Sequence, residues 1–119
     1  MRPHFRFEDL EIWQLAKQMA VDFHRLAETL EARKYYRYAE QLRGAGLSVP
    51  NNIAEGSGSL HVAEFCQFLN IARRSLFENA SMLLVFEAMG LWQKGQIDAL
   101  LSDGDKLSRM ITNFTRSRK

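Results

Sequence analysis

The chain has 119 residues, of which 46% are hydrophobic and 25% charged, so it can build one continuous core and is not typical of a disordered chain. Its 16 basic and 14 acidic side chains give a net charge of +2, a weaker excess than a dedicated nucleic-acid binder usually carries. The single cysteine, Cys66, excludes an intrachain disulfide, and no apolar run is long enough for a membrane span, so we expect a cytoplasmic protein.

Four segments have apolar residues at every third or fourth position, which predicts helices, and no segment alternates as a strand does. The first predicted helix covers about residues 9–30, with Asp9 as its N-cap. The second covers about residues 36–55 and contains Gly44, Gly46 and Pro50, which are unfavourable inside a helix. We interpret the two glycines as a close contact with another helix, and Pro50 as a bend.

The third predicted helix covers about residues 60–89 and follows the turn at residues 56–59. Asn79 is the one polar residue on its apolar seam. The fourth helix is predicted over about residues 93–115, after a stop at Gly90. Connections this short place successive helices antiparallel, so we predict one all-α domain over residues 1–119, an up-down-up-down four-helix bundle.

Residues that could support catalysis in a bundle are scarce. A di-iron site needs Glu-x-x-His pairs, and none of His4, His24 and His61 has a glutamate three positions before it. HExxH, CxxC and phosphate-loop motifs are also missing. We therefore predict no catalytic residue, no metal and no cofactor, and keep a small enzyme or metal-binding bundle as a remote alternative.

Several motifs resemble those of a known family: Phe7-Glu8-Asp9-Leu10, Trp13-Gln14, Gln41-Leu42-Arg43, the run from Ser48 to Gly56, Glu64-Phe65, the run from Phe68 to Arg73, and Ser75-Leu76. With them, residues 7–115 resemble the bacterial four helix bundle protein family, whose members include reading frames inside intervening sequences of large-subunit ribosomal RNA genes. The resemblance implies a homopentameric ring without enzymatic activity. A protein of similar fold, the accessory variability protein of diversity-generating retroelements, forms such a ring and binds nucleic acid and a reverse transcriptase.

The chain departs from the family pattern at three places. Ser59, Leu60 and His61 stand where the family commonly has a basic pair and a capping serine. Asn79 replaces a common leucine, and Arg74 replaces a small residue. The basic turn is therefore lost, and one arginine lies on the third predicted helix instead.

A hairpin of the second and third helices centred near residues 58–59 would place Arg43 opposite Arg74 and Asn52 opposite Phe65. From this register we predict an interhelical charge network of Glu40, Arg43, Arg73, Arg74 and Glu78. The network either fixes the register and forms subunit contacts, or its arginines form a patch for phosphates that is repeated around an assembly. The resemblance and the register together single out Trp13, Pro50, Asn52, Glu55, Gly56, Glu64, Ser75 and Glu78 as motif residues with structural roles.

A second basic feature is the end of the chain, because residues 109–119 carry Arg109, Arg116, Arg118 and Lys119 and no acid. Such cations suit a solvated helix C-terminus, and clustered cations also bind phosphates. Our leading hypothesis is a non-enzymatic, oligomeric scaffold or adaptor that binds itself and RNA or DNA. The alternative is a protein-interaction module that binds no nucleic acid.

Overall fold

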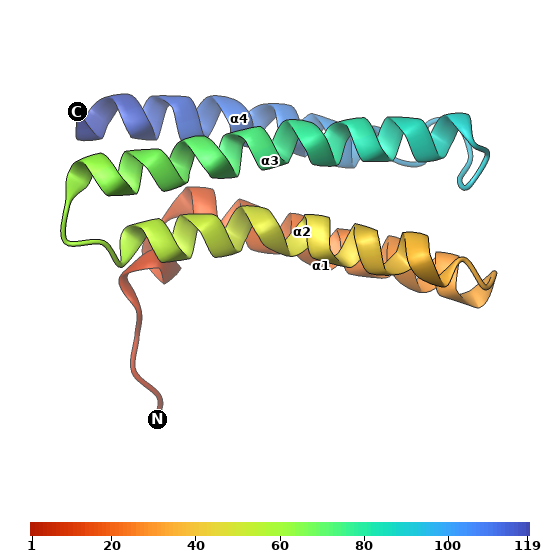
Figure 1. Cartoon of the computed structure of the whole chain (residues 1–119), viewed down its shortest axis with the longest axis horizontal. Helices are drawn as coiled ribbons and strands as arrows, with labels where there is room; N and C mark the ends of the chain where they lie inside the picture. The colour runs from red at the N-terminus through yellow and green to blue at the C-terminus, as the bar shows by residue number, and fades with distance from the viewer.

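The computed structural model describes residues 1–119 and consists of four long helices with no strand. The helices are α1 (Glu11–Ala32), α2 (Tyr36–Ser57), α3 (Val62–Ala88) and α4 (Asp98–Arg118), preceded by a short 3-10 turn, η1 (Arg6–Asp9). The chain reverses direction at each connection (Figure 1). Each helix contacts only its two neighbours around the bundle, with α1 closing on α4. The predicted all-α four-helix bundle is confirmed.

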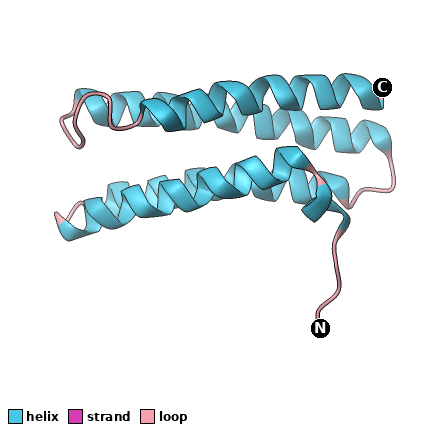
Figure 2. Cartoon of the chain, turned by 180° about the vertical axis from the view of Figure 1, so that it is seen from behind, coloured by secondary structure: helices cyan, strands magenta, loops and turns pink.

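One core runs through the bundle because the apolar seams of all four helices face inward. It contains 21 apolar residues, and the largest of those that are almost completely buried are Phe23, Leu30, Leu42, Ile53, Leu69, Leu83, Ile97, Leu107 and Ile111. The loops lie only at the ends of the bundle, and the N-terminal segment projects away from it (Figure 2). No helix combines the length and the apolar character that a membrane crossing requires.

The start of α1 differs from the prediction. Leu10, not Asp9, occupies the N-cap position, and no side chain caps the helix. Asp9 lies in η1, where its carboxylate is 2.9 Å from Nε2 of His4. The turn is held by Glu8, which accepts hydrogen bonds from Arg2 and from the backbone N–H of Phe5. These bonds, that from Arg2 first, lower the pKa of the Glu8 carboxyl to about 2.

The start of α4 also differs, because residues 90–97 form a loop that closes one end of the core. Leu91, Trp92 and Ile97 are buried in it, and the indole N–H of Trp92 donates to the carbonyl of Leu83 at 3.3 Å. Gly90 and Gly95 have φ values of +79° and +89°, which other residues rarely adopt. The buried Ile97 matches the spacing of the helix that follows, which explains why the prediction began the helix too early.

Helix α2 continues without a break through its two glycines and Pro50. A Cβ atom on Gly46 would lie 2.7 Å from Cβ of Phe23 in α1, so Gly46 is a close helix contact as predicted. Gly44 has nothing within 4 Å of the same position, so its part of that prediction is wrong. Near Pro50, the Asn52 amide donates to the carbonyl of Ser48 at 2.7 Å, a structural role of the kind predicted.

The register between α2 and α3 is not the predicted one. The predicted hairpin would place Ala45 opposite Ala72, but the carbonyl of Ala45 accepts a hydrogen bond from the Asn79 amide at 2.8 Å. The rings of Tyr38 and Phe86, 5.0 Å apart, give the same register. The shift is about two helical turns. It arises because α2 continues to Ser57 and α3 starts beyond the end of α2 (Figure 1).

Candidate nucleic-acid interface

Arg43 lies on the side of α2 that faces α1. Its Nη2 donates to Oε1 of Glu31 at 2.5 Å, and its Nε to Nδ1 of His24 at 3.2 Å. The hydrogen bond from Arg43 lowers the pKa of the Glu31 carboxyl, and the same bond raises the pKa of Arg43. Arg43 is therefore already neutralised by an acid of α1 and does not meet the arginines of α3.

The predicted charge network does not form. Glu40, Arg74 and Glu78 are exposed and make no ion pair in the protomer. Successive side chains on a helix point in directions about 100° apart. Arg43 follows the core residue Leu42, and this rotation turns it toward α1 rather than α3. Hairpin register fixes the height of a residue along the bundle but not the side of the helix on which it lies.

Arg73 and Arg74 are neighbours in sequence but lie in different surroundings. Arg74 is exposed, whereas Arg73 is half-buried and lies over Phe77, with its guanidinium carbon 4.8 Å from the ring centre. Arg73 faces α4 and lines the groove between α3 and α4. The three arginines predicted to form one patch thus occupy three separate places.

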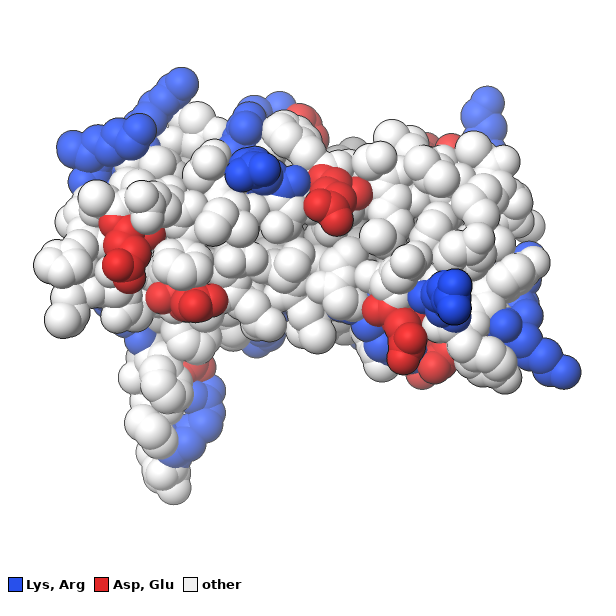
Figure 3. All heavy atoms as spheres, viewed as in Figure 1, with Lys and Arg blue, Asp and Glu red and all other residues white.

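The cations that do gather belong to the last turn of α4. Arg116, Arg118 and Lys119 are exposed there and make no ion pair, and Arg118 lies over Phe114 at 4.2 Å from the ring centre. Long basic side chains extend from this end of the bundle, other basic side chains lie at the opposite end, and much of the face between them is uncharged (Figure 3). Arg109, one of the four cations noted in the sequence, instead pairs with Asp105 at 2.8 Å.

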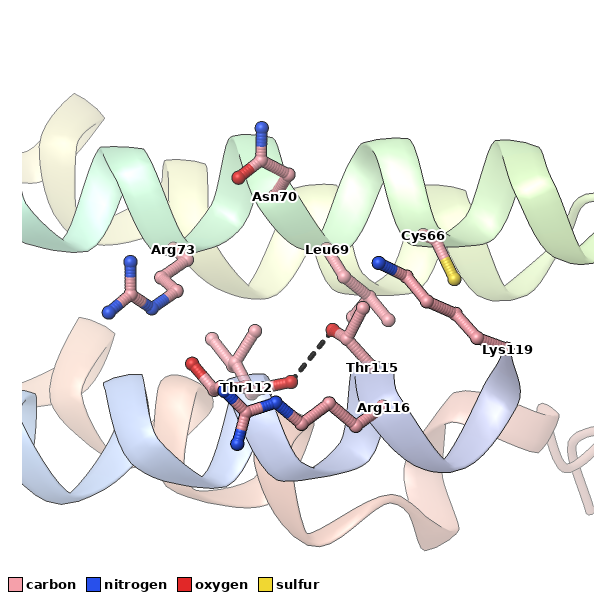
Figure 4. Close-up of a pocket in the computed structure, with 9 residues that line it drawn as sticks. Cys66, Leu69, Asn70, Arg73, Thr112, Thr115, Arg116 and Lys119 are labelled. Atoms are coloured by element: carbon pink, nitrogen blue, oxygen red, sulfur yellow. Dashed lines mark hydrogen bonds between the residues drawn. The ribbon is translucent and has the colours of Figure 1, made fainter.

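A groove of about 420 Å³ between α3 and α4 brings Arg73 together with two of these cations, Arg116 and Lys119. Its floor is Leu69 and Ile111, and its cations are Arg73, Arg116 and Lys119. No aspartate or glutamate side chain lines it. Arg73 extends from α3 toward α4, Arg116 extends along α4 toward Arg73, and Lys119 turns back toward α3 (Figure 4). We name this set of four cations, Arg73, Arg116, Arg118 and Lys119, the basic end.

The sequence predicts three of the four members of the basic end as one cluster, and only Arg73 was assigned elsewhere. The acid-free stretch after Arg109 was a visible signal, and Arg73 was singled out for another patch. The pairing of Arg73 with α4 had no sequence signal, because the height of α4 beside α3 depends on the buried loop at residues 90–97.

Two of the motif residues, Trp13 and Pro50, line a second groove, between α1 and α2. Trp13 is half-buried against Phe7, with ring centres 5.0 Å apart, and Lys17 lies over its ring at 5.2 Å. Leu47 and Arg43 complete the part of this groove formed by α2. This groove holds about 380 Å³ and, like the first, has no aspartate or glutamate side chain in its lining.

The remaining motif residues do not converge on a site. A Cβ atom on Gly56 would lie 2.5 Å from Cβ of Phe68, so Gly56 permits the close approach of α3. Ser75 is half-buried, and the acidic residues Glu55, Glu64 and Glu78 are exposed and spread along α2 and α3.

Glu55, one of the motif residues with a predicted structural role, makes no side-chain hydrogen bond or ion pair in the protomer. Only the backbone carbonyl of Glu55 takes part in the turn after α2, accepting from the N–H of Gly58 at 3.1 Å. No group of three or more His, Cys, Asp or Glu side chains is placed to hold a metal ion.

The family model described as "23S rRNA-intervening sequence protein" matches residues 8–113, which span all of α1, α2 and α3 and most of α4. No curated protein matches the chain.

Proposed function

This chain belongs to the 23S rRNA-intervening sequence protein family, and we propose that it is a cytoplasmic, non-enzymatic scaffold that assembles from several copies and binds nucleic acid through the basic end. The observation that carries the proposal is the gathering of Arg73, Arg116, Arg118 and Lys119 at one end of the bundle without an acidic partner. Cations without an acidic partner can neutralise phosphates and release the counterions condensed on a nucleic acid, which is the main source of sequence-independent affinity.

The same cations also stabilise α4, because positive charge is favourable at a helix C-terminus. This structural role does not conflict with binding, since three of the four side chains are exposed and free to meet a ligand. A single protomer offers few phosphate contacts, so a protomer alone would bind weakly. An assembly that repeats the basic end several times gains affinity without new contacts.

Exposed apolar side chains on α3 support assembly. Each of these side chains exposes between 41% and 53% of its surface: Ile71, Phe77, Leu84 and Val85 on α3, and Met89 directly after it. Soluble monomers rarely expose large continuous apolar patches, and such patches commonly mark interfaces. We propose that other copies of the chain cover this face, and that five copies form the assembly, as the family resemblance implies.

Assembly can be tested with Leu84→Asp, since a charge in an apolar interface is costly to bury. We expect the parent protein to have a mass several times that of the 13.8 kDa protomer, and the variant to dissociate while its helical circular dichroism is retained. Leu47→Asp on α2, where Leu47 is 52% exposed, is the matched control and should remain assembled. A parent protein that sediments as a protomer would contradict the proposal.

Nucleic-acid binding can be tested by filter binding to duplex RNA and duplex DNA at two salt concentrations. Replacing Arg116, Arg118 and Lys119 by glutamine is expected to weaken binding about tenfold and to reduce the slope of log affinity against log salt by roughly 2–3. The matched control replaces Lys34, Arg37 and Lys94, at the opposite end of the bundle, and should bind as the parent does.

Equal losses in the two triple variants would contradict a localised basic end. An assembled protein that binds neither nucleic acid at low salt would favour the alternative, a protein-interaction module.

A further inference from the structure

The groove between α3 and α4 is built from two facing stripes of side chains. On α3 the stripe is Cys66 and Arg73, and on α4 it is Thr112 and Arg116, each spaced so that its members lie on one helix face. Cys66 and Thr112 are small, which keeps the space between the two helices open above Leu69. Lys119 closes the end of the groove (Figure 4). The result is a recess with an apolar floor and cationic walls.

Arg73 is the least satisfied polar group in the protein. Its Nε is the only buried side-chain nitrogen or oxygen without a hydrogen-bond partner. An unpaired buried donor is costly, and an arginine held this way normally has a carboxylate or a phosphate beside it. The guanidinium carbon lies 4.8 Å from the ring centre of Phe77, and Arg116 extends toward Arg73 along α4 (Figure 4). A second cation beside the first raises the cost further unless an anion lies between them.

We propose that this groove binds one phosphate group, held by Arg73, Arg116 and Lys119. The proposal rests on the proposed function, because the groove is part of the basic end, and it names the ligand chemistry of that end. The phosphate can belong to a nucleic-acid strand or to a small phosphorylated molecule. Both present the same tetrahedral oxygens to the groove.

The donor set selects phosphate over a carboxylate. Thr112 and Thr115 donate their hydroxyl protons to the carbonyls of Ser108 and Ile111, at 3.0 Å and 2.7 Å, so the donors that remain for a ligand are the three cations and the amide of Asn70. The three cations approach from α3, from α4 and from the chain end. The oxygens of a phosphate diverge and can meet all three, whereas a planar carboxylate meets one arginine fork along its edge.

The first test compares Arg73→Gln with Arg74→Gln, which removes the same charge from the adjacent, exposed position outside the groove. Inorganic phosphate is titrated against chloride at constant ionic strength while the melting temperature is measured. A ligand that binds only the folded protein raises this temperature. We expect phosphate to stabilise the parent and Arg74→Gln equally, and its apparent affinity for Arg73→Gln to be about tenfold weaker. Any general salting effect of phosphate is the same in both variants.

Arg116→Gln, at an exposed position, keeps the test valid if Arg73→Gln folds poorly, and it should weaken phosphate binding similarly. Equal stabilisation of the parent, Arg73→Gln and Arg116→Gln by phosphate would overturn the proposal.

The second test uses Cys66, the only cysteine, as a reporter inside the groove. Its alkylation by iodoacetamide should slow in inorganic phosphate and in the presence of a bound RNA duplex, because both would occupy the groove. If phosphate slows the alkylation of Cys66 but the RNA duplex does not bind, the phosphate site in the groove is supported. The nucleic-acid part of the proposed function is then refuted, and the ligand is a small phosphorylated molecule. If RNA binds the basic end but neither ligand slows the alkylation of Cys66, the proposed phosphate site in the groove is wrong. The proposed function is not affected by that result.

Discussion

Replacing Asn79 by aspartate is expected to lower the free energy of unfolding by about 3–5 kcal/mol at neutral pH, the cost of an uncompensated buried charge. Asn79 is 4% exposed, and its amide donates to the carbonyl of Ala45 at 2.8 Å. An aspartate there would face the same carbonyl with an oxygen that cannot donate. Folding would also transfer its charge from water into the apolar seam of α3, which is costly. Urea unfolding followed by circular dichroism measures the change.

The matched control is Asn79→Leu, for which we expect a change within about 1 kcal/mol. The carbonyl of Ala45 keeps a hydrogen bond from the Ser48 hydroxyl at 2.7 Å, so removing the amide leaves no unsatisfied acceptor. Acidification should restore part of the stability lost in Asn79→Asp relative to the control, since protonation removes the buried charge and supplies a donor. An aspartate tolerated as well as leucine would show that position 79 does not face α2.

Asn79 also illustrates how far the sequence predicts the fold. The three-and-four spacing identified α3 and marked Asn79 as the one polar residue on its seam. The spacing could not identify its partner, because that partner is a backbone carbonyl and carries no sequence signal. The partner depends on the α2–α3 register, and the predicted register was wrong by about two turns. A hairpin centre estimated from turn residues assumes that both helices end level with each other, and here α3 starts beyond the end of α2.

The candidate site was harder to predict than the fold for a related reason. A core position tolerates an error of a residue or two in a predicted boundary, because the apolar stripe is broad. A polar pair does not. Arg43 was predicted to meet α3, and a rotation of about one residue places it against Glu31 of α1 instead. Arg73 meets the end of α4 only because Leu91, Trp92 and Ile97 bury the intervening loop and fix the height of α4.

The close approach of α1 and α2 leads to the second large effect, at Gly46. Gly46→Ala is expected to destabilise the fold by about 2 kcal/mol, although alanine is intrinsically favoured over glycine in a helix by up to ~1 kcal/mol. The new Cβ would lie 2.7 Å from Cβ and 3.1 Å from Cγ of Phe23. Phe23 cannot rotate its Cβ away, since that atom is fixed to the backbone of α1, and its ring is buried. The two helices would have to separate, which opens the core around Leu42.

Gly44→Ala, two positions earlier on the same helix, separates this packing effect from helix propensity. Position 44 is exposed and has no neighbour within 4 Å of a new Cβ atom, so only the propensity term remains. We expect this variant to be stabilised by about 0.5–1 kcal/mol. The two alanine variants should therefore move the urea midpoint in opposite directions. A shift in the same direction would mean that Phe23 does not press on α2 at Gly46, and the α1–α2 packing that positions Arg43 against Glu31 would need to be redrawn.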